Sequence, residues 1–169
     1  MNPVIRPATL ADIDAMQQIE IASGELWAAI GMQDIADDGA HETELLECYV
    51  HDAQAWVAVA DGAVCGYAIA DVIDGNAHLE QVTVRPEFGR RGIGRQILDE
   101  VIAWARAQQF RSITLLTFRD VAWNGPYYAR LGFVEIADAE LGPELAALRT
   151  HEATLGLDVS SRMAMRLSL

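Results

Sequence analysis

The segment at residues 82–95 constrains the fold more than any other part of the chain. An alternating apolar run typical of a strand passes through a glycine-rich turn into a helical pattern that continues to Gln109. Gly92 and Gly94 have no Cβ, so backbone N–H groups in the turn are open to a bulky anion. The start of a helix adds roughly half a positive charge. The sequence therefore predicts a strand, turn and helix that together hold a pyrophosphate.

A glycine pair after a strand is also compatible with a tight turn that binds nothing. Two well-known phosphate-binding motifs fit poorly. Ile97 stands at the third glycine position of the dinucleotide fingerprint, and the chain contains no lysine, which a P-loop requires. A nucleotide-binding module of those kinds is therefore disfavoured.

Strand-like and helix-like patterns alternate along the rest of the chain. We expect strands at residues 4–6, 55–60, 64–73, 79–84, 113–118, 133–136 and 163–167. We expect helices at residues 10–21, 45–49, 92–109, 127–131 and 139–156, the first of them preceded by Thr9. Asp61 and Gly62 suit a tight hairpin turn, and residues 31–39 lack periodicity and are predicted to form a loop.

A length of 169 residues with 51% hydrophobic side chains predicts one domain, residues 1–169, that folds alone. The apolar stretches are too short to span a membrane and no signal peptide opens the chain, so we expect a cytoplasmic protein. A net charge of -13 opposes general nucleic-acid binding. Cys48 and Cys65 lack metal-ligand spacing, so neither a metal site nor a disulfide framework is expected.

Arginines gather in one short region of this acidic chain, which indicates a local anion site. They are Arg85, Arg90, Arg91, Arg95 and Arg106.

Two motifs resemble the GNAT superfamily of acyl-CoA-dependent N-acyltransferases. Residues 82–95 are similar to the family's pantetheine-binding strand and pyrophosphate loop, and residues 127–133 (YYARLGF) are similar to its aromatic-Tyr-x-x-x-Gly-Phe signature. Residues 5–9 followed by Asp12 look like a typical family start. The resemblance covers most of the chain. It implies an α/β fold with a central mixed, mostly antiparallel sheet of about seven strands flanked by about four helices.

The resemblance also implies acetyl-CoA as cosubstrate. The residues that it implies in cofactor binding are Val82, Thr83, Val84, Gly89, Arg90, Arg91, Gly92, Ile93, Gly94, Arg95, Asn124 and Tyr128. Gly89 stands where the family usually has Gln or Arg, so we expect Arg90 or Arg91 to substitute. Asn124 lies about one helical turn closer to Tyr128 than the family's pantetheine-contacting Asn. Its alternative role is the N-cap of the short helix.

Acyl transfer to an amine needs a proton acceptor, because an alkylamine with a pKa of roughly 10 is protonated at neutral pH. His78 and Glu80 lie two apart on one strand and share a face. The resemblance places both positions near the acyl group, and we rank Glu80 above His78 as the base, acting directly or through water. The alternative for each is a solvated strand residue. By resemblance Tyr128 protonates the departing thiolate, the alternative being a core aromatic.

The acceptor is expected to meet the N-terminal part. Trp27, Met32 and nearby acids are candidates for a pocket that takes a cationic amine, the alternative being a loop with solvated charges. These acids are Glu25, Asp34, Asp37 and Asp38.

These residues predict an acyltransferase that moves an acetyl group from acetyl-CoA to a primary amine, that of a small cationic molecule, by direct transfer in a ternary complex. One alternative is a non-catalytic acyl-CoA-binding sensor or regulatory protein, and another is a protein N-terminal or lysine acetyltransferase. The expected partner is the small-molecule acceptor, with no nucleic acid, membrane or metal, and a homodimer is left open.

Overall fold

The structure is a computed structural model that describes residues 3–169. Contacts divide the chain into two compact units, which we call the N-terminal unit (Met1–Ala70 and Gln81–Ala103) and the C-terminal unit (Asp71–Glu80 and Trp104–Leu169). The described strands form a seven-stranded sheet in the order β1-β2-β3-β4-β5-β7-β6. The β4–β5 pair is parallel, whereas β1–β2, β2–β3, β5–β7 and β6–β7 are antiparallel. The predicted mixed, mostly antiparallel sheet is thus confirmed.

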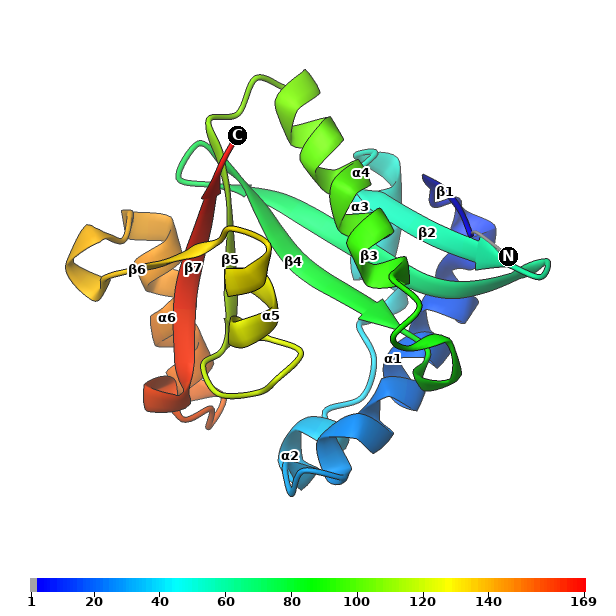
Figure 1. Cartoon of the computed structure of the whole chain (residues 1–169), viewed down its shortest axis with the longest axis horizontal. Coiled ribbons are helices and arrows are strands. Elements are labelled where there is room, and N and C mark those ends of the chain that lie inside the picture. Colours follow the sequence, from blue (N-terminus) through cyan, green and yellow to red (C-terminus); the bar gives the residue numbers. More distant parts are fainter. Residues whose placement is uncertain (1–2) are drawn as a thin grey trace. The chain divides into compact units, whose positions relative to one another are not determined.

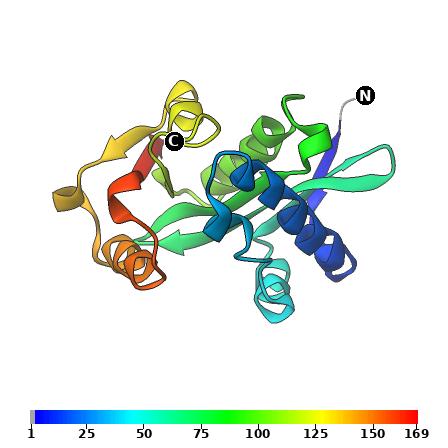
Figure 2. The same ribbon diagram turned by 90° about the horizontal axis from the view of Figure 1, so that it is seen from below.

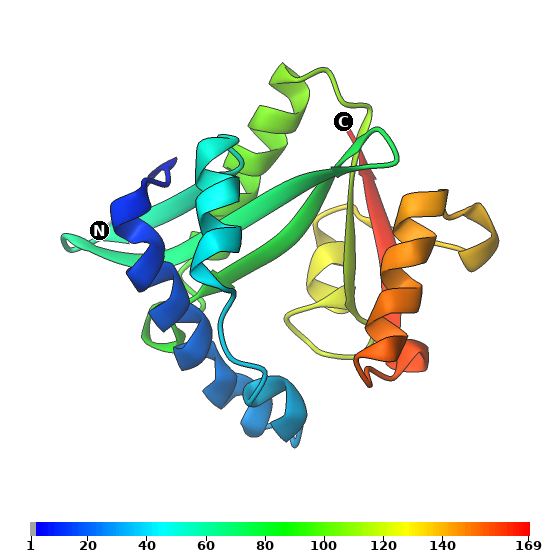
Figure 3. The same ribbon diagram turned by 180° about the vertical axis from the view of Figure 1, so that it is seen from behind.

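In the N-terminal unit, helices cover both faces of the strands (Figures 1 and 2). α1 and α3 lie on one face, as the view from behind shows (Figure 3), and α4 lies on the other. The elements are β1 (Val4–Pro7), α1 (Ile13–Ala28), α2 (Gln33–Ala36), α3 (Thr43–His51), β2 (Ala55–Ala60), β3 (Ala63–Ile73), β4 (Asn76–Val84) and α4 (Ile93–Ala107). The last residues of β3 and α4 and the first five of β4 belong to the C-terminal unit.

The core of the N-terminal unit joins the apolar stripe of α1 to one face of β2 and β3. Met16 and Ile19 of α1 pack with Val57 and Tyr67, all fully buried. On the opposite face the backbone of Gly66 comes close to α4, since a Cβ there would lie 3.0 Å from the Ile97 Cδ1 atom. The small residue therefore lets α4, and the turn that precedes it, pack tightly on the strands.

In the C-terminal unit, α5 lies on one face of β5 and β7 and α6 on the other (Figures 1 and 3). Leu145 of α6 packs against Ala164 and Ile136 in a second core. The elements wholly within this unit are β5 (Ser112–Phe118), α5 (Gly125–Arg130), β6 (Val134–Ile136), α6 (Pro143–Thr154) and β7 (Arg162–Ser168).

The backbone confirms the predicted hairpin at Asp61 and Gly62, whose φ angles are 52° and 80°. Asp74 and Gly75 repeat this geometry, with φ angles of 50° and 70°. Gly132 follows α5 with a φ of 95°, the left-handed conformation in which a glycine commonly ends a helix.

Three expectations about helices need correction. The first helix extends to Ala28 rather than Ile21 and opens with a 3-10 turn at Leu10–Asp12. The predicted loop at residues 31–39 contains α2, whose Ala36 carbonyl oxygen would lie only 2.8 Å from a Cβ at Gly24. This close crossing is a tertiary contact that local periodicity does not report. The helix expected from residue 139 begins at Pro143, because Asp138–Glu140 form a separate 3-10 turn. The single-domain organisation stays a prediction.

Candidate active site

The glycine turn belongs to the N-terminal unit and leads from a 3-10 turn (Pro86–Phe88) into α4. Arg90 and Gly92 adopt positive φ angles of 58° and 75°, and the Gly92 carbonyl accepts the first helical hydrogen bond, from the Gln96 N–H at 3.1 Å. The preceding N–H groups at the start of α4 have no partner within the helix. A Cβ on Gly92 would meet nothing within 4 Å, so the side of the turn is open. These features are typical of an anion-binding helix start, and the binding of a pyrophosphate here stays a prediction.

The arginines of this turn differ in how they are held. The Arg91 guanidinium donates to the Glu87 carbonyl oxygen at 3.0 Å and lies 5.2 Å from the centre of the Phe88 ring. Arg95 pairs with an aspartate one helical turn on, at 2.8 Å. Arg90 is exposed, and its side chain makes no hydrogen bond or ion pair with any residue in the described range 3–169. Arg90 is therefore the arginine most available to an incoming anion.

The half-buried residues Val82, Thr83 and Val84 precede this turn on β4. They run beside β3: the Arg85 N–H donates to the Cys65 carbonyl at 2.9 Å, and a Cβ on Gly66 would lie 3.1 Å from the Thr83 carbonyl oxygen. Further back along the strand, the parallel pairing of β4 with β5 covers three residue pairs, from Ala77 to Leu79.

His78 and Glu80 of the C-terminal unit project from the same face of β4, as their spacing predicts. The His78 Nε2 atom lies 3.7 Å from Glu80 Oε2, and its Nδ1 atom lies 2.8 Å from Thr114 Oγ1 on β5. His78 is only 1% exposed, and this burial lowers its pKa from 6.5 to about 4, so the imidazole is neutral at neutral pH. The Glu80 side chain is 35% exposed. A solvated strand position is therefore the wrong description of His78.

Tyr128 lies on α5, where its ring packs edge-on against Phe133 and Tyr127 at centroid distances of 5.5 and 5.4 Å. Desolvation raises the pKa of its hydroxyl well above the ordinary value, so the group keeps its proton at neutral and mildly alkaline pH. No hydrogen bond joins this hydroxyl to another residue in the part of the chain that the structure describes. The ring is thus packed as a core aromatic, and the role of its hydroxyl as a proton donor stays a prediction.

Asn124 occupies the N-cap position of α5 but does not cap it with its side chain. Its Oδ1 atom instead accepts from Thr117 Oγ1 at 2.8 Å and from the Phe118 N–H at 3.4 Å. The side chain therefore fastens the start of α5 to the end of β5. The side-chain capping role is wrong, and cofactor contact stays a prediction.

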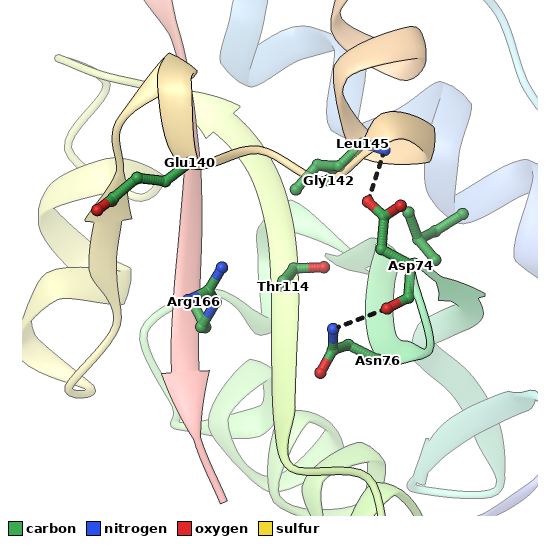
Figure 4. A pocket seen from close by; sticks show the side chains of 8 residues that line it. Asp74, Asn76, Thr114, Glu140, Gly142, Leu145 and Arg166 are labelled. Atoms are coloured by element: carbon green, nitrogen blue, oxygen red, sulfur yellow. Dashed lines mark hydrogen bonds between the residues drawn. The ribbon is translucent and has the colours of Figure 1, made fainter.

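A pocket of about 240 Å³ in the C-terminal unit was not foreseen from the sequence (Figure 4). Thr114 and Arg166 contribute to its lining from neighbouring strands, and Asp74 and Gly142 border it from the β3–β4 turn and the segment before α6. The Asp74 carboxylate accepts the Glu144 and Leu145 N–H groups at 2.9 and 3.0 Å, so it caps α6. The only sequence signal for this site is the Asp-Gly turn itself.

The model of the acetyltransferase (GNAT) family matches residues 15–133. The chain belongs to this family. The predicted acyltransferase activity and the use of CoA are thereby confirmed at the level of the family.

Relatives and solved structures agree with the assignment. The GNAT chain is 26% identical over 149 residues to an amino-acid acetyltransferase of Mycobacterium tuberculosis, a match that covers 85% of this chain and 75% of the relative. Its fold is similar to that of the PaiA N-acetyltransferase from Thermoplasma acidophilum in complex with coenzyme A (TM-score 0.76, 18% identity, 100% of both chains). It is also similar to N-acetylglutamate synthase from Neisseria gonorrhoeae complexed with coenzyme A and N-acetyl-glutamate (TM-score 0.74, 19% identity, 100% of this chain and 35% of the other).

The acids expected on the acceptor side of this GNAT chain are solvent-exposed around the end of α1 and α2. They are Glu25, Asp34, Asp37 and Asp38. Asp37 accepts a hydrogen bond from Gln33 Nε2 at 2.8 Å, while Trp27 and Met32 are half-buried. The solvated-charge alternative describes these carboxylates in the structure.

Within residues 3–169, no three His, Cys, Asp or Glu side chains are grouped so as to hold a metal ion. Nor does this described range contain a helix with the length and apolar character needed to cross a membrane.

Proposed function

We propose that residues 1–169 act as one N-acetyltransferase domain that moves an acetyl group from acetyl-CoA to the primary amine of a small cationic molecule, by direct transfer in a ternary complex. The observation that carries the proposal is the pairing of His78 and Glu80 on one face of β4, with Nε2 and Oε2 3.7 Å apart. A neutral imidazole beside a part-exposed carboxylate is suited to accepting the proton of an ammonium group.

The cofactor's pyrophosphate is proposed to bind the N–H groups at the start of α4, where Gly92 and Gly94 allow close approach. Arg90 takes the place of the family's Gln or Arg, since Arg91 is already held by Glu87 and Phe88. Gly89, Ile93 and Arg95 complete the loop. The backbone groups of Val82, Thr83 and Val84 are proposed to pair with the pantetheine arm, as an added strand would.

Glu80 is proposed to receive the ammonium proton. Its side chain is 35% exposed, so a water molecule is able to carry the proton where direct contact fails. The freed amine then attacks the thioester carbonyl carbon, a C–N bond forms and the C–S bond breaks. The nitrogen, cationic after the attack, releases its second proton to water and becomes the neutral amide. Tyr128, whose hydroxyl is protonated at the start of the reaction, gives this proton to the departing thiolate and regains one from water.

The acceptor class is supported by two similar proteins. The curated relative is named as an amino-acid acetyltransferase, and one structural neighbour carries N-acetyl-glutamate. Both names point to a small molecule with a primary amine. A positive charge on the acceptor is proposed because the acids around α2, although solvated and not gathered in a pocket, give this region a negative potential that attracts cations.

An acceptor screen tests the proposal. Release of free CoA thiol is followed at fixed acetyl-CoA with amino acids, polyamines, and peptides bearing a free N-terminus or lysine, and products are identified by mass spectrometry. We expect an acetylated small amine. Acetylation of peptides alone supports the protein acetyltransferase alternative. Saturable acetyl-CoA binding without turnover on any acceptor supports the sensor alternative, and either outcome overturns the proposed function.

A further inference from the structure

Three polar side chains form a row across the C-terminal unit. His78 of β4 is in register with Thr114 of β5, which is in register with Arg166 of β7. Residues directly opposite one another in a sheet project from the same face. Thr114 is therefore held beside His78 by the sheet itself. Both are buried, with exposed fractions of 4% for Thr114 and 1% for His78.

The contacts of Thr114 favour one assignment of the hydrogens over the other. Its Oγ1 atom lies 2.8 Å from His78 Nδ1 and donates to the Ala77 carbonyl oxygen at 3.4 Å. A hydroxyl has one proton to donate and two lone pairs to accept with. With its proton directed to Ala77, Thr114 accepts from Nδ1–H of the imidazole.

The other ring nitrogen offers no equivalent bond. His78 Nε2 is 3.7 Å from Glu80 Oε2, which is beyond hydrogen-bond reach. A neutral imidazole carries one N–H, and in a buried site that N–H belongs where it finds an acceptor.

We propose that Thr114 is a positioning residue that holds His78 in the Nδ1–H tautomer, so that the lone pair of Nε2 faces Glu80. The catalytic meaning of this assignment rests on the proposed function, because it matters to turnover only if His78 takes part in proton transfer. The tautomer itself does not depend on that function.

The tautomer determines whether Nε2 of His78 can accept a proton during the reaction. A lone pair on Nε2 accepts a proton arriving from the side of Glu80 and the amine. The opposite tautomer presents an N–H there and accepts nothing. Thr114 thus decides whether the buried imidazole serves as an acceptor, without touching the acetyl group or the amine.

Nitrogen-15 NMR of the full chain at neutral pH tests the tautomer directly, since protonated and unprotonated imidazole nitrogens resonate far apart. The chain has four histidines, and the pair of imidazole signals that disappears in His78→Asn belongs to His78. We expect Nδ1 protonated and Nε2 unprotonated in the parent. Thr114→Val should abolish this pattern, while Thr114→Ser, which keeps a hydroxyl, should restore it. Thr117→Val removes another buried β5 hydroxyl and should leave the His78 signals unchanged.

A protonated Nε2 in the parent overturns the proposal, and so does a His78 pattern that Thr114→Val leaves unaltered. If Thr114→Val fails to fold, the parent spectrum and Thr114→Ser still decide the tautomer.

Kinetics tests the positioning role separately. We expect Thr114→Val to lower kcat/KM toward the level of His78→Asn, with no further loss in the double variant and an unchanged Kd for acetyl-CoA. Additive losses overturn the positioning role. If the NMR pattern is as expected but His78→Asn retains full turnover, the proposed part of His78 in catalysis fails and the tautomer assignment stands.

Discussion

Two regions of the molecule are built in opposite ways: the glycine turn before α4, and the His78 group, which consists of His78 and Glu80 of β4 and Thr114 of β5. The turn presents backbone N–H groups, and its Gly92 and Arg90 lie at the surface. The His78 group consists of side chains, and His78 and Thr114 are buried. A backbone site depends on local conformation, so a short stretch of sequence encodes it. A buried side-chain site depends on partners from other strands, so its chemistry is set by tertiary structure.

The largest effect is expected from Tyr128→Phe on α5, which should separate catalysis from the cofactor binding assigned to the glycine turn. The ring and its packing against Phe133 stay, and only the proton donor is lost. We expect kcat to fall roughly 100- to 10,000-fold while acetyl-CoA binding is kept. Rapid-mixing kinetics with the acetyl-transfer step shown to limit the rate measures the effect. An unchanged kcat contradicts the acid role.

Glu80→Gln should lower kcat/KM by about 100-fold or more at neutral pH, where the acceptor amine is protonated. The defect should shrink as the pH approaches the pKa of the amine, because a free amine needs no base. A profile of kcat/KM against pH for parent and variant measures this. A loss that is the same at every pH, together with a lower Tm, indicates a structural role instead. The acid limb of the parent profile should not reflect His78, whose pKa of about 4 keeps it neutral above that pH.

The buried imidazole also predicts a pH dependence of stability. The pKa of His78 falls from 6.5 in the unfolded chain to about 4 in the fold, so between these values only the unfolded chain binds the proton. The free energy of unfolding should therefore decrease by about 3 kcal/mol as the pH falls through this window. Denaturant titrations of the parent and His78→Asn at pH 7 and pH 4 measure the difference. An equal decrease in the free energy of unfolding of both proteins shows that His78 does not contribute to this pH dependence.

The smallest effect is expected from Gly94→Ala in the glycine turn, which should weaken the stabilisation of the fold by acetyl-CoA. A Cβ on Gly94 would meet only Val84 Cγ2, at an ordinary 3.7 Å, so Gly94→Ala should fold and even gain helix propensity. Its methyl group should hinder the approach of a pyrophosphate. The parent should be stabilised by about 2.7 kcal/mol with acetyl-CoA at a hundredfold excess over Kd, and the variant by clearly less. Thermal unfolding with and without acetyl-CoA measures both. An equal shift in the variant removes the phosphate role from this turn.

The strands, α4 and the hairpin at Asp61 and Gly62 were predictable because periodicity and turn chemistry are local signals. The pairing of His78 with Glu80 was predictable for the same reason, since residues two apart on a strand share a face. The burial of His78 and its bond to Thr114 were not, because 36 residues separate the two partners. The short helix α2 was not predicted because its four residues are too few to show a periodicity of their own.

The cap of α6 shows what such long-range dependence means for the order of folding. The Asp74 carboxylate that satisfies the N–H groups of Glu144 and Leu145 comes from a hairpin turn about 70 residues earlier. A Cβ at Gly142 would clash with this carboxylate and displace it from the cap. A helix whose first turn is satisfied only by a distant side chain has little reason to persist before that side chain arrives. We therefore expect α6 to form after the β3–β4 turn has closed and to be among the first elements to open.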